Sequence, residues 1–394
     1  MLFKNIAKNL NSDYLCLKIQ MKNYKSGQYI NQGYYKSFQP TLINKQLHID
    51  DMEVMQLLSQ ADRELGRLDM YSKYIPNIDL FISMHVVKEA TQSSKIEGTQ
   101  TNVDEALLDK EDIPIDKRDD WEEVQNYINA QQWAINELDE LPFSSRLIKE
   151  THKILLQGVR GEKKQPGEFR TSQNWIGGAT INDATFIPPV HTSVPELMSD
   201  IEKFIHNNEI FVPELLKIGI VHYQFETIHP FLDGNGRIGR LLIPLYLVSK
   251  GILKKPILYL SEFFEKHRQL YYDNLMIVRE KSNLSQWFKF FLVGIIETSK
   301  NGIKTFDNIL QLQKQVESEI QRLGSRVAKA KKVIDYLYQR PIIDAEKVSE
   351  VADISMPSSY RLISDLEEMI ILKEVTGGQR SRTYVFENYL RLFR

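Results

Sequence analysis

Hydrophobic residues recur at helical spacing through most of the chain from residue 52 onward. A period of 3.6 residues is kept by Val54, Met55, Leu58, Ala61, Leu65 and Leu68, and again by Val124, Tyr127, Ile128, Ala130 and Trp133. Further helices are expected around 147–155, over 263–278 and over 287–296. The pattern predicts a mainly α-helical protein.

Two stretches depart from helical spacing. Residues 22–39 are rich in Tyr, Asn, Gln and Gly and keep no sustained period, so we expect an irregular arm there. Residues 174–189 hold short β-prone runs separated by glycines and by Asn182 and Asp183, which predicts a β-hairpin. By itself this pattern is equally typical of an ordinary surface hairpin.

The pattern changes again after residue 301. Residues 308–323 are polar with one apolar side, which predicts a helical connector packed on a neighbour. Three short helices follow over 327–338, 344–352 and 355–369, and then two β-prone runs flank Gly377 and Gly378. Three helices followed by a hairpin resemble a winged helix-turn-helix, here covering 324–394.

That resemblance implies DNA contact, but the charges support it weakly. Its recognition helix would begin near Ser358, Ser359, Tyr360 and Arg361, and its wing would carry Arg380 and Arg382. The segment holds twelve Lys plus Arg against ten Asp plus Glu, a small excess for a DNA-binding unit. DNA contact, protein contact and an internal scaffold role all stay open.

Composition bounds the remaining possibilities. With 394 residues, 42% of them hydrophobic, the chain can form two or three domains with real cores. The 50 basic and 52 acidic residues nearly balance, so no general polyanion-binding surface is implied. The one cysteine, Cys16, excludes an internal disulfide. We find no long apolar run and no signal peptide in 1–20, and expect a cytoplasmic protein without a membrane span, starting at Met1 or Met21.

The most informative stretch is 229–240, His-Pro-Phe-Leu-Asp-Gly-Asn-Gly-Arg-Ile-Gly-Arg. Gly-Asn-Gly between two apolar helical segments predicts a turn that opens a new helix. The free N–H groups of a helix N-terminus bind phosphate, and glycines let the backbone approach an anion closely. Arg237 and Arg240 are three residues apart, so we expect both guanidinium groups on one helix face. This arrangement suits a polyphosphate.

The residues before the turn supply the other chemistry. Asp233 would repel a phosphate unless a divalent cation lay between them, and Mg²⁺ prefers one or two carboxylates together with phosphate oxygens and water. His229, with an ordinary pKa of about 6.5, can accept a hydroxyl proton. Phe231 is expected to face inward and hold the loop. Each residue alone is commonplace, but together they predict nucleotidyl transfer.

The stretch 229–240, called the strip below, resembles the signature of Fic domain proteins, His-x-Phe-x-Asp/Glu-Gly-Asn-Gly-Arg-x-x-Arg, with every fixed position filled. The resemblance implies a Fic-type helical bundle with a β-hairpin flap, and transfer of AMP from ATP to a Ser, Thr or Tyr hydroxyl of a target protein. It implies His229 as general base, Asp233 as Mg²⁺ ligand and Arg240 at the γ-phosphate. The implied ATP-binding residues of the strip are Gly234, Asn235, Gly236, Arg237, Ile238, Gly239 and Arg240. Gly236 favours adenylylation, because Doc-type members that phosphorylate typically carry Lys there.

A second motif lies upstream, at the end of a helix predicted from about residue 78. Ser93 and Glu97 are four residues apart on one face, Gly98 is placed just past the helix end, and Thr101 or Asn102 is placed at the next N-cap. The pair could be an ordinary exposed one. Ser-x-x-x-Glu-Gly is also similar to the inhibitory motif of Fic proteins. That resemblance implies that Glu97 pairs with Arg240 and displaces the γ-phosphate.

The Fic resemblance implies further contacts. The edge of the flap, placed at Thr185, Phe186 and Ile187, would align a target segment by strand addition. The helix over 261–279 would border the adenine, with Lys266, Tyr271 and Tyr272 as candidates, although aromatic residues at helical spacing are more often core. His85, His152 and His222 are expected to be structural, and no zinc-site spacing is seen.

The expected division is an arm (1–45), a helical region with the inhibitory helix (46–118), a Fic core (119–300), a connector (301–323) and the winged-helix-like unit (324–394). A DNA-associated regulator whose Fic-like domain senses nucleotide is the alternative to an adenylyltransferase, and AMP removal is a further family reaction. The target hydroxyl is open, and a homodimer is an expectation drawn from relatives alone.

Overall fold

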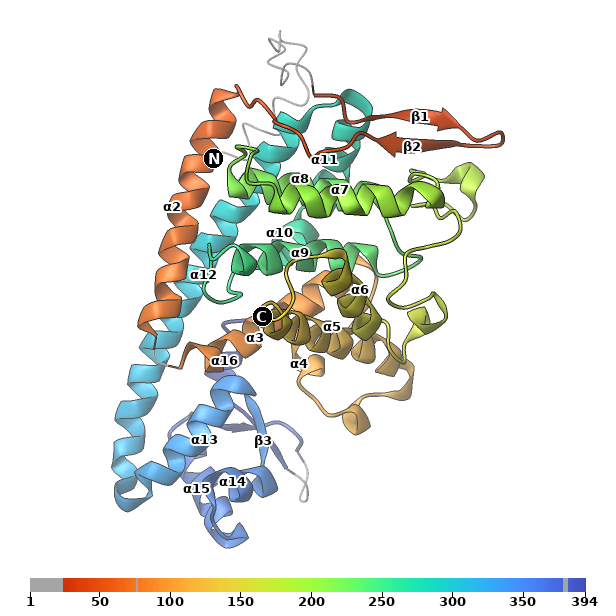
Figure 1. The fold of residues 1–394 in the computed structure, drawn as a ribbon. Helices are drawn as coiled ribbons and strands as arrows, with labels where there is room; N and C mark the ends of the chain where they lie inside the picture. The colour runs from red at the N-terminus through yellow and green to blue at the C-terminus, as the bar shows by residue number, and fades with distance from the viewer. Residues whose placement is uncertain (1–23, 76, 378–381) are drawn as a thin grey trace.

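The computed structural model describes residues 24–75, 77–377 and 382–394, and these are mostly helical (Figure 1). Cys16, Met21 and Arg380 lie outside the described residues. Helices α2 (Met52–Tyr74) and α12 (Leu284–Ile320) run side by side along one flank of the molecule. Within the described residues, no helix is both long enough and apolar enough to span a bilayer.

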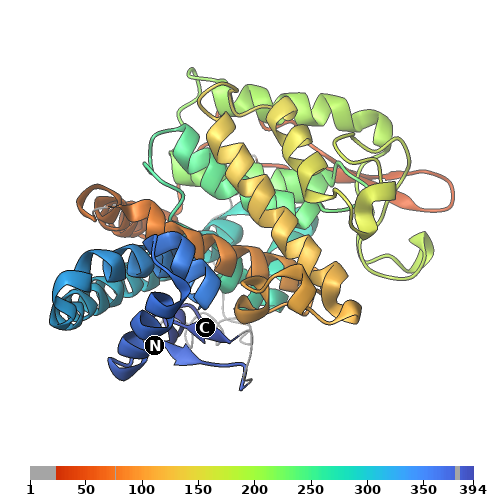
Figure 2. The same ribbon diagram turned by 90° about the horizontal axis from the view of Figure 1, so that it is seen from below.

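The remaining long helices form a bundle beside this pair (Figures 1 and 2). They are α3 (Ile78–Ile96), α5 (Arg118–Glu137), α6 (Ser145–Leu155), α7 (Val194–His206), α8 (Glu214–Ile228), α9 (Asn235–Ser249) and α11 (Arg268–Lys281), with the short α4 (Val103–Ala106) and α10 (Ser261–Lys266). Helix α8 is apolar on all sides and is buried from Leu215 to Ile228, because the other helices surround it. The 229–240 strip begins at the C-terminal end of this buried helix.

The sequence pattern predicted which segments are helical better than it predicted where each helix begins and ends. The helices expected over 52–68, 124–133 and 147–155 are confirmed as α2, α5 and α6. The single helix expected over 263–278 is wrong, because His267 leaves helical geometry (ψ 35°) and separates α10 from α11. The helix expected over 287–296 continues to Ile320, since Phe306, Ile309 and Leu312 are buried and this part of α12 packs along α2. The connector boundary expected at residue 301 therefore falls inside a helix.

The arm expected to be irregular contains a β-hairpin. Strands β1 (Gly27–Asn31) and β2 (Lys36–Pro40) pair antiparallel, with Tyr29 opposite Phe38. Phe38 is buried against Phe186, and its N–H donates to Ile187 O at 2.9 Å. Tertiary pairing rather than local alternation makes these residues strands, so the sequence pattern did not reveal them.

The hairpin expected over 174–189 is reduced to one antiparallel bridge between Ile176 and Phe186, with a 3₁₀ turn, Ile181–Asp183, at its tip. The free edge expected at Thr185, Phe186 and Ile187 needs correction. Thr185 is exposed, but Phe186 and Ile187 are buried and the carbonyl of Ile187 accepts from β2. The N-terminal hairpin covers this edge.

The C-terminal residues follow the predicted order of three helices and then a strand pair. The elements are α13 (Val327–Gln339), β3 (Ile342–Asp344), α14 (Ala345–Ala352), α15 (Met356–Glu368), β4 (Lys373–Glu374), β5 (Thr383–Val385) and α16 (Glu387–Leu390), and the sheet order is β3-β5-β4. The sequence did not indicate β3 or α16. This unit lies against α3 (Figure 1). Tyr338 meets Phe81 edge-on there, with ring centroids 5.0 Å apart.

Candidate active site

The α8–α9 corner has the sharp turn expected from Gly-Asn-Gly. His229 ends α8 in the left-handed region (φ 49°), and Gly234 (φ 73°) precedes the first residue of α9. The Asn235 side chain closes the loop, because its Oδ1 accepts from Phe231 N–H at 2.8 Å and its Nδ2 donates to Phe231 O at 2.9 Å. Asn235 therefore shapes the loop with its side chain, leaving its backbone N–H at the helix N-terminus for an anion.

His152 packs against this loop. Its ring stacks on the buried Phe231 with centroids 3.7 Å apart. Its Nδ1 accepts from Gly167 N–H at 2.9 Å, so Nε2 carries the proton and donates to Asp233 O at 3.0 Å. Burial lowers the pKa of His152 to about 4, which keeps the ring neutral. The expected structural role is confirmed, and it consists of holding the strip.

Arg170 is a buried clamp that the sequence did not single out as functional. Its guanidinium donates to backbone carbonyls, Nε to His229 O at 3.0 Å and Nη2 to Ile228 O at 3.3 Å and Pro189 O at 2.5 Å. Burial lowers its pKa to about 10. Because Pro189 ends the segment expected as the flap, Arg170 connects that segment to the α8–α9 corner.

The imidazole of His229 is neutral in this environment. Burial lowers its pKa to about 3; the neighbouring Arg279 and Arg170 lower it further, whereas Glu97 acts in the opposite direction. A neutral ring has a nitrogen lone pair free to accept a proton at pH 7. The general-base role expected for His229 is chemically possible here.

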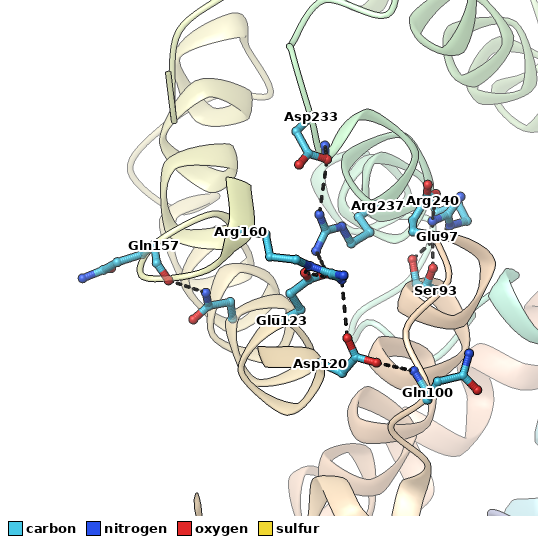
Figure 3. Close-up of polar contacts among 12 residues, drawn as sticks. Ser93, Glu97, Gln100, Asp120, Glu123, Gln157, Arg160, Asp233, Arg237 and Arg240 are labelled. Atoms are coloured by element: carbon cyan, nitrogen blue, oxygen red, sulfur yellow. Dashed lines mark hydrogen bonds and ion pairs between the residues drawn. The ribbon is translucent and has the colours of Figure 1, made fainter. Parts of the chain in front are cut away.

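Arg240 is held by the upstream motif, as the resemblance implied (Figure 3). Its Nη2 lies 2.6 Å from Glu97 Oε1, and its Nε donates to Ser93 Oγ at 2.9 Å. The Arg240 side chain is 2% exposed and that of Glu97 35%. Gly98 follows the helix end with φ 108°, and Asn102 caps α4, both as predicted.

Glu97 lies where an anion would bind. Burial raises its pKa, but the charge and hydrogen bond of Arg240 more than offset this, so the pKa is lowered and the carboxylate is ionised. A Cβ at Gly236 would collide with Glu97 Oε1, which shows that the carboxylate rests against the first turn of α9. A carboxylate at the C-terminal end of α3 is unfavourable for that helix, so contacts with Arg240 and with the N-terminus of α9 account for its position.

Arg237 pairs with a different carboxylate. Its Nη1 lies 3.0 Å from Glu123 Oε2 on α5, and its Nη2 lies 3.7 Å from Asp233 (Figure 3). The side chains of Arg237 and Glu123 are only 4% and 6% exposed. The two arginines of the strip thus pair with carboxylates from different helices, and Glu123 is a site residue that the sequence did not reveal.

Asp233 is the candidate metal ligand. Its side chain is 42% exposed, and one oxygen accepts from its own neighbour, Gly234 N–H, at 2.6 Å. Nowhere in the described ranges do three or more His, Cys, Asp or Glu side chains gather as a metal site. One exposed carboxylate beside an anion-binding turn fits Mg²⁺, which completes its coordination with phosphate oxygens and water.

Three residues expected at the nucleotide face the core instead. Ile238 is buried. Gly239 packs against Glu226, and its carbonyl accepts from His222 Nδ1 at 2.8 Å. Tyr271 is buried with its hydroxyl 2.8 Å from His222 Nε2. His222 is therefore structural as expected.

Of the other adenine candidates, Lys266 is exposed and Tyr272 is exposed over 38% of its surface. Burial and the Glu97 charge raise the pKa of Tyr272, which indicates that its ring lies close to the Glu97–Arg240 pair. Tyr272 remains the better placed of the two for a nucleotide contact.

Comparisons with known proteins agree with this geometry. The Fic/DOC family N-terminal profile matches residues 55–136, and the Fic/DOC family profile matches residues 142–247. Residues 55–136 and 142–247 of the chain are thus similar to the two parts of the Fic/DOC family. It is 32% identical over 158 residues to a protein adenylyltransferase Fic from Aedes aegypti, covering 40% of this chain and 28% of the mosquito protein. It is 26% identical over 238 residues to a probable protein adenylyltransferase from Aquifex aeolicus, covering 60% and 70%. The match thus spans less than a third of the length of the mosquito Fic protein.

Solved Fic structures share the fold. A Fic family protein from Desulfovibrio desulfuricans superposes with a TM-score of 0.56 at 17% identity, covering 87% of this chain and 98% of that protein. A Fic domain containing signaling protein from Bacteroides thetaiotaomicron gives 0.50 at 19% identity, covering 64% and 96%. The likeness to the first extends well beyond residues 55–247.

Proposed function

We propose that this protein is an adenylyltransferase that transfers AMP from ATP to a Ser, Thr or Tyr hydroxyl of a target protein. The observation that carries the proposal is the α8–α9 corner, where His229 and the buried Arg240 flank the N-terminus of α9, against which the Glu97 carboxylate rests. The names of the mosquito and Aquifex relatives support the same reaction.

In the proposed reaction the triphosphate lies on the first turn of α9. His229 accepts the proton of the target hydroxyl, whose oxygen attacks the α-phosphorus of ATP. The bond from the α-phosphorus to the oxygen bridging it to the β-phosphorus breaks, and pyrophosphate leaves with the bonding electrons. Arg237 and the N–H groups at the helix N-terminus stabilise the charge on the departing group. Mg²⁺ held by Asp233 would neutralise part of the phosphate charge.

The contact between Glu97 and Arg240 supports autoinhibition. Since the Glu97 carboxylate rests on both Arg240 and the first turn of α9, a γ-phosphate and Glu97 compete for the same donors. ATP then binds weakly or with its α-phosphorus out of line. Removal of the Glu97 carboxylate is expected to increase AMP transfer by at least about tenfold, the factor that about 1.4 kcal/mol represents.

The flap would align the target through the segment that begins at Asn174 rather than at residues 185–187. Asn174 Nδ2 donates to Phe231 O at 2.9 Å and to His229 O at 3.2 Å, so this end of the flap lies at the catalytic corner. Trp175, next to it, is exposed. We infer that a target strand adds beside Trp175, because β2 already covers the Ile187 edge.

Labelled ATP tests the reaction directly. Glu97→Gly protein incubated with Mg²⁺ and ATP is expected to gain label from the α-phosphate and none from the γ-phosphate. Label from the γ-phosphate would indicate phosphorylation, and no label with either ATP would contradict self-modification. An added proteome extract extends the test to foreign targets.

A further inference from the structure

Helix α5 carries two acidic residues three positions apart, Asp120 and Glu123, that bind groups from three other segments (Figure 3). Glu123 contacts Arg237 on α9 and Arg160 in the 3₁₀ turn Arg160–Lys163. Asp120 lies 3.4 Å from Arg160 Nη2 and accepts from Gln100 N–H at 2.7 Å, in the turn after the Glu97 helix. A chain of polar contacts thus connects the phosphate-binding strip to the end of α3.

Glu123 uses its two oxygens for different arginines. Oε2 lies 3.0 Å from Arg237 Nη1, and Oε1 accepts from Arg160 Nε at 2.7 Å. Arg237 Nε is buried and meets no acceptor among the residues that the structure describes, and Nη2 has only the 3.7 Å contact to Asp233. Glu123 therefore engages one nitrogen and leaves the Nε–Nη2 edge of the guanidinium uncommitted. That edge has the two parallel N–H bonds that bind a phosphate.

We propose that Glu123 is a positioning residue that holds Arg237 with its Nε–Nη2 edge toward the inner phosphates of ATP, and that Arg160 supplies the charge that balances Glu123. The proposal rests on the proposed ATP-dependent function. Glu123 does not touch the nucleotide in this assignment and acts through Arg237.

Arg160 is needed because a buried carboxylate close to a polyphosphate would weaken its binding. The hydrogen bond that Arg160 donates to Glu123 is the largest cause of the raised pKa of Arg160, whose side chain is 59% exposed. The backbone after it packs at the site, since a Cβ at Gly161 would lie 3.2 Å from Asp233 Oδ2. Without Arg160, Glu123 would be free to turn both oxygens toward Arg237 and to engage the edge that the phosphate needs.

The experiment uses full-length Glu97→Gly protein as the parent, so that the nucleotide site is open. Calorimetry with Mg·ATP measures the Kd, and self-modification rates give KM and kcat. Glu123→Gln in this parent is expected to raise Kd and KM for ATP about tenfold or more, because a misdirected guanidinium loses its paired bonds. Arg160→Ala is expected to change both constants in the same direction. Arg160 is a surface residue, so this second variant keeps the test valid if Glu123→Gln does not fold.

Two controls separate positioning from general damage. Glu122→Gln alters the neighbouring carboxylate, which pairs with Lys110 away from the strip, and should leave the Kd for ATP unchanged. In an Arg237→Ala parent, Glu123→Gln should add no further loss of ATP affinity, since its effect passes through Arg237. If Glu123 had only a structural role, Glu123→Gln would instead lower the affinity for ATP equally in the parents with and without Arg237.

The outcomes are distinct. Unchanged ATP affinity in both Glu123→Gln and Arg160→Ala overturns this proposal while leaving the adenylyltransferase proposal intact. A full additional loss in the Arg237→Ala parent also overturns it. A Glu97→Gly parent that binds no Mg·ATP contradicts the proposed function itself, before any Glu123 variant is made.

Discussion

At the scale of single residues, the state of His229 decides whether the site can act as a base. Its pKa of about 3 means that the ring stays neutral far below pH 6.5. The Glu97 charge raises the pKa of His229, so removal of Glu97 lowers this pKa further. We therefore expect kcat/KM for self-modification by Glu97→Gly protein to show no loss between about pH 8 and pH 5 from protonation of this base. A fall with an apparent pKa near 6.5 would mean that His229 is not buried as described.

Apart from Ser93 and Glu97, which a second motif indicated, the site residues that the sequence revealed are those close together in the chain. His229, Asp233 and Arg240 could be found because the turn that they share is local. Glu123 lies 114 residues before Arg237, and no periodicity connects them. Burial also argues against one expected ATP contact, because Ile238 belongs to the strip yet faces the core.

At the scale of elements, the α8–α9 corner depends on Asn235, whose amide satisfies both backbone groups of Phe231. Asn235→Ala leaves the buried N–H of Phe231 without its acceptor and removes one of the two donors to its C=O, the other being Asn174 Nδ2, so we expect a loss of about 2 kcal/mol in the free energy of unfolding. Urea denaturation measures it. Asn126→Ala removes one exposed hydrogen bond, to Gln157 O, and should cost less than about 1 kcal/mol. Equal costs would show that the corner does not need Asn235.

Helix periodicity predicted which segments are helices but not where several of them end. The expected limits failed at His267, where local geometry breaks the helix, and beyond Ile296, where packing on α2 extends it. The β1–β2 hairpin was missed because its partner, Ile187, lies far along the chain. Whether such residues form strands depends on pairing between distant segments, and the local sequence pattern carries no information about that pairing.

At the scale of the whole molecule, the C-terminal unit braces the helix that carries Glu97. Phe393 packs edge-on against His85 of α3 with ring centroids 5.0 Å apart, and Arg394 pairs with Asp104 of α4. Phe393→Ala is expected to lower the free energy of unfolding by about 3 kcal/mol. Because α3 loses a support, self-modification should rise above the wild-type level but stay below that of Glu97→Gly. Arg391→Ala, an exposed neighbour, is the matched control, and an equal effect of both changes would contradict the account.

Stability should fall on acidification. Burial lowers the pKa of His85, His222 and His229 to about 3 and that of His152 to about 4. Between about pH 6.5 and 4 the unfolded chain binds these protons and the folded protein does not, so each ring removes up to about 1.4 kcal/mol per pH unit as the pH falls. Glu226, whose pKa burial raises to about 7, acts in the opposite direction, and so do Glu89, Asp62, Asp200 and Asp335, whose pKa values burial also raises. Urea midpoints at pH 7 and pH 5 test this, and a higher midpoint at pH 5 would be inconsistent with it.

The central claim, that the α8–α9 corner transfers AMP and that Glu97 restrains it, is tested most directly by one time course. Intact-mass spectrometry follows wild type, Glu97→Gly and Glu97→Gly with His229→Ala in Mg·ATP. We expect rapid gain of the mass of one or more AMP groups by Glu97→Gly, slow gain by wild type and none by the double variant. Equal gain by all three proteins, or no gain by Glu97→Gly, would contradict it.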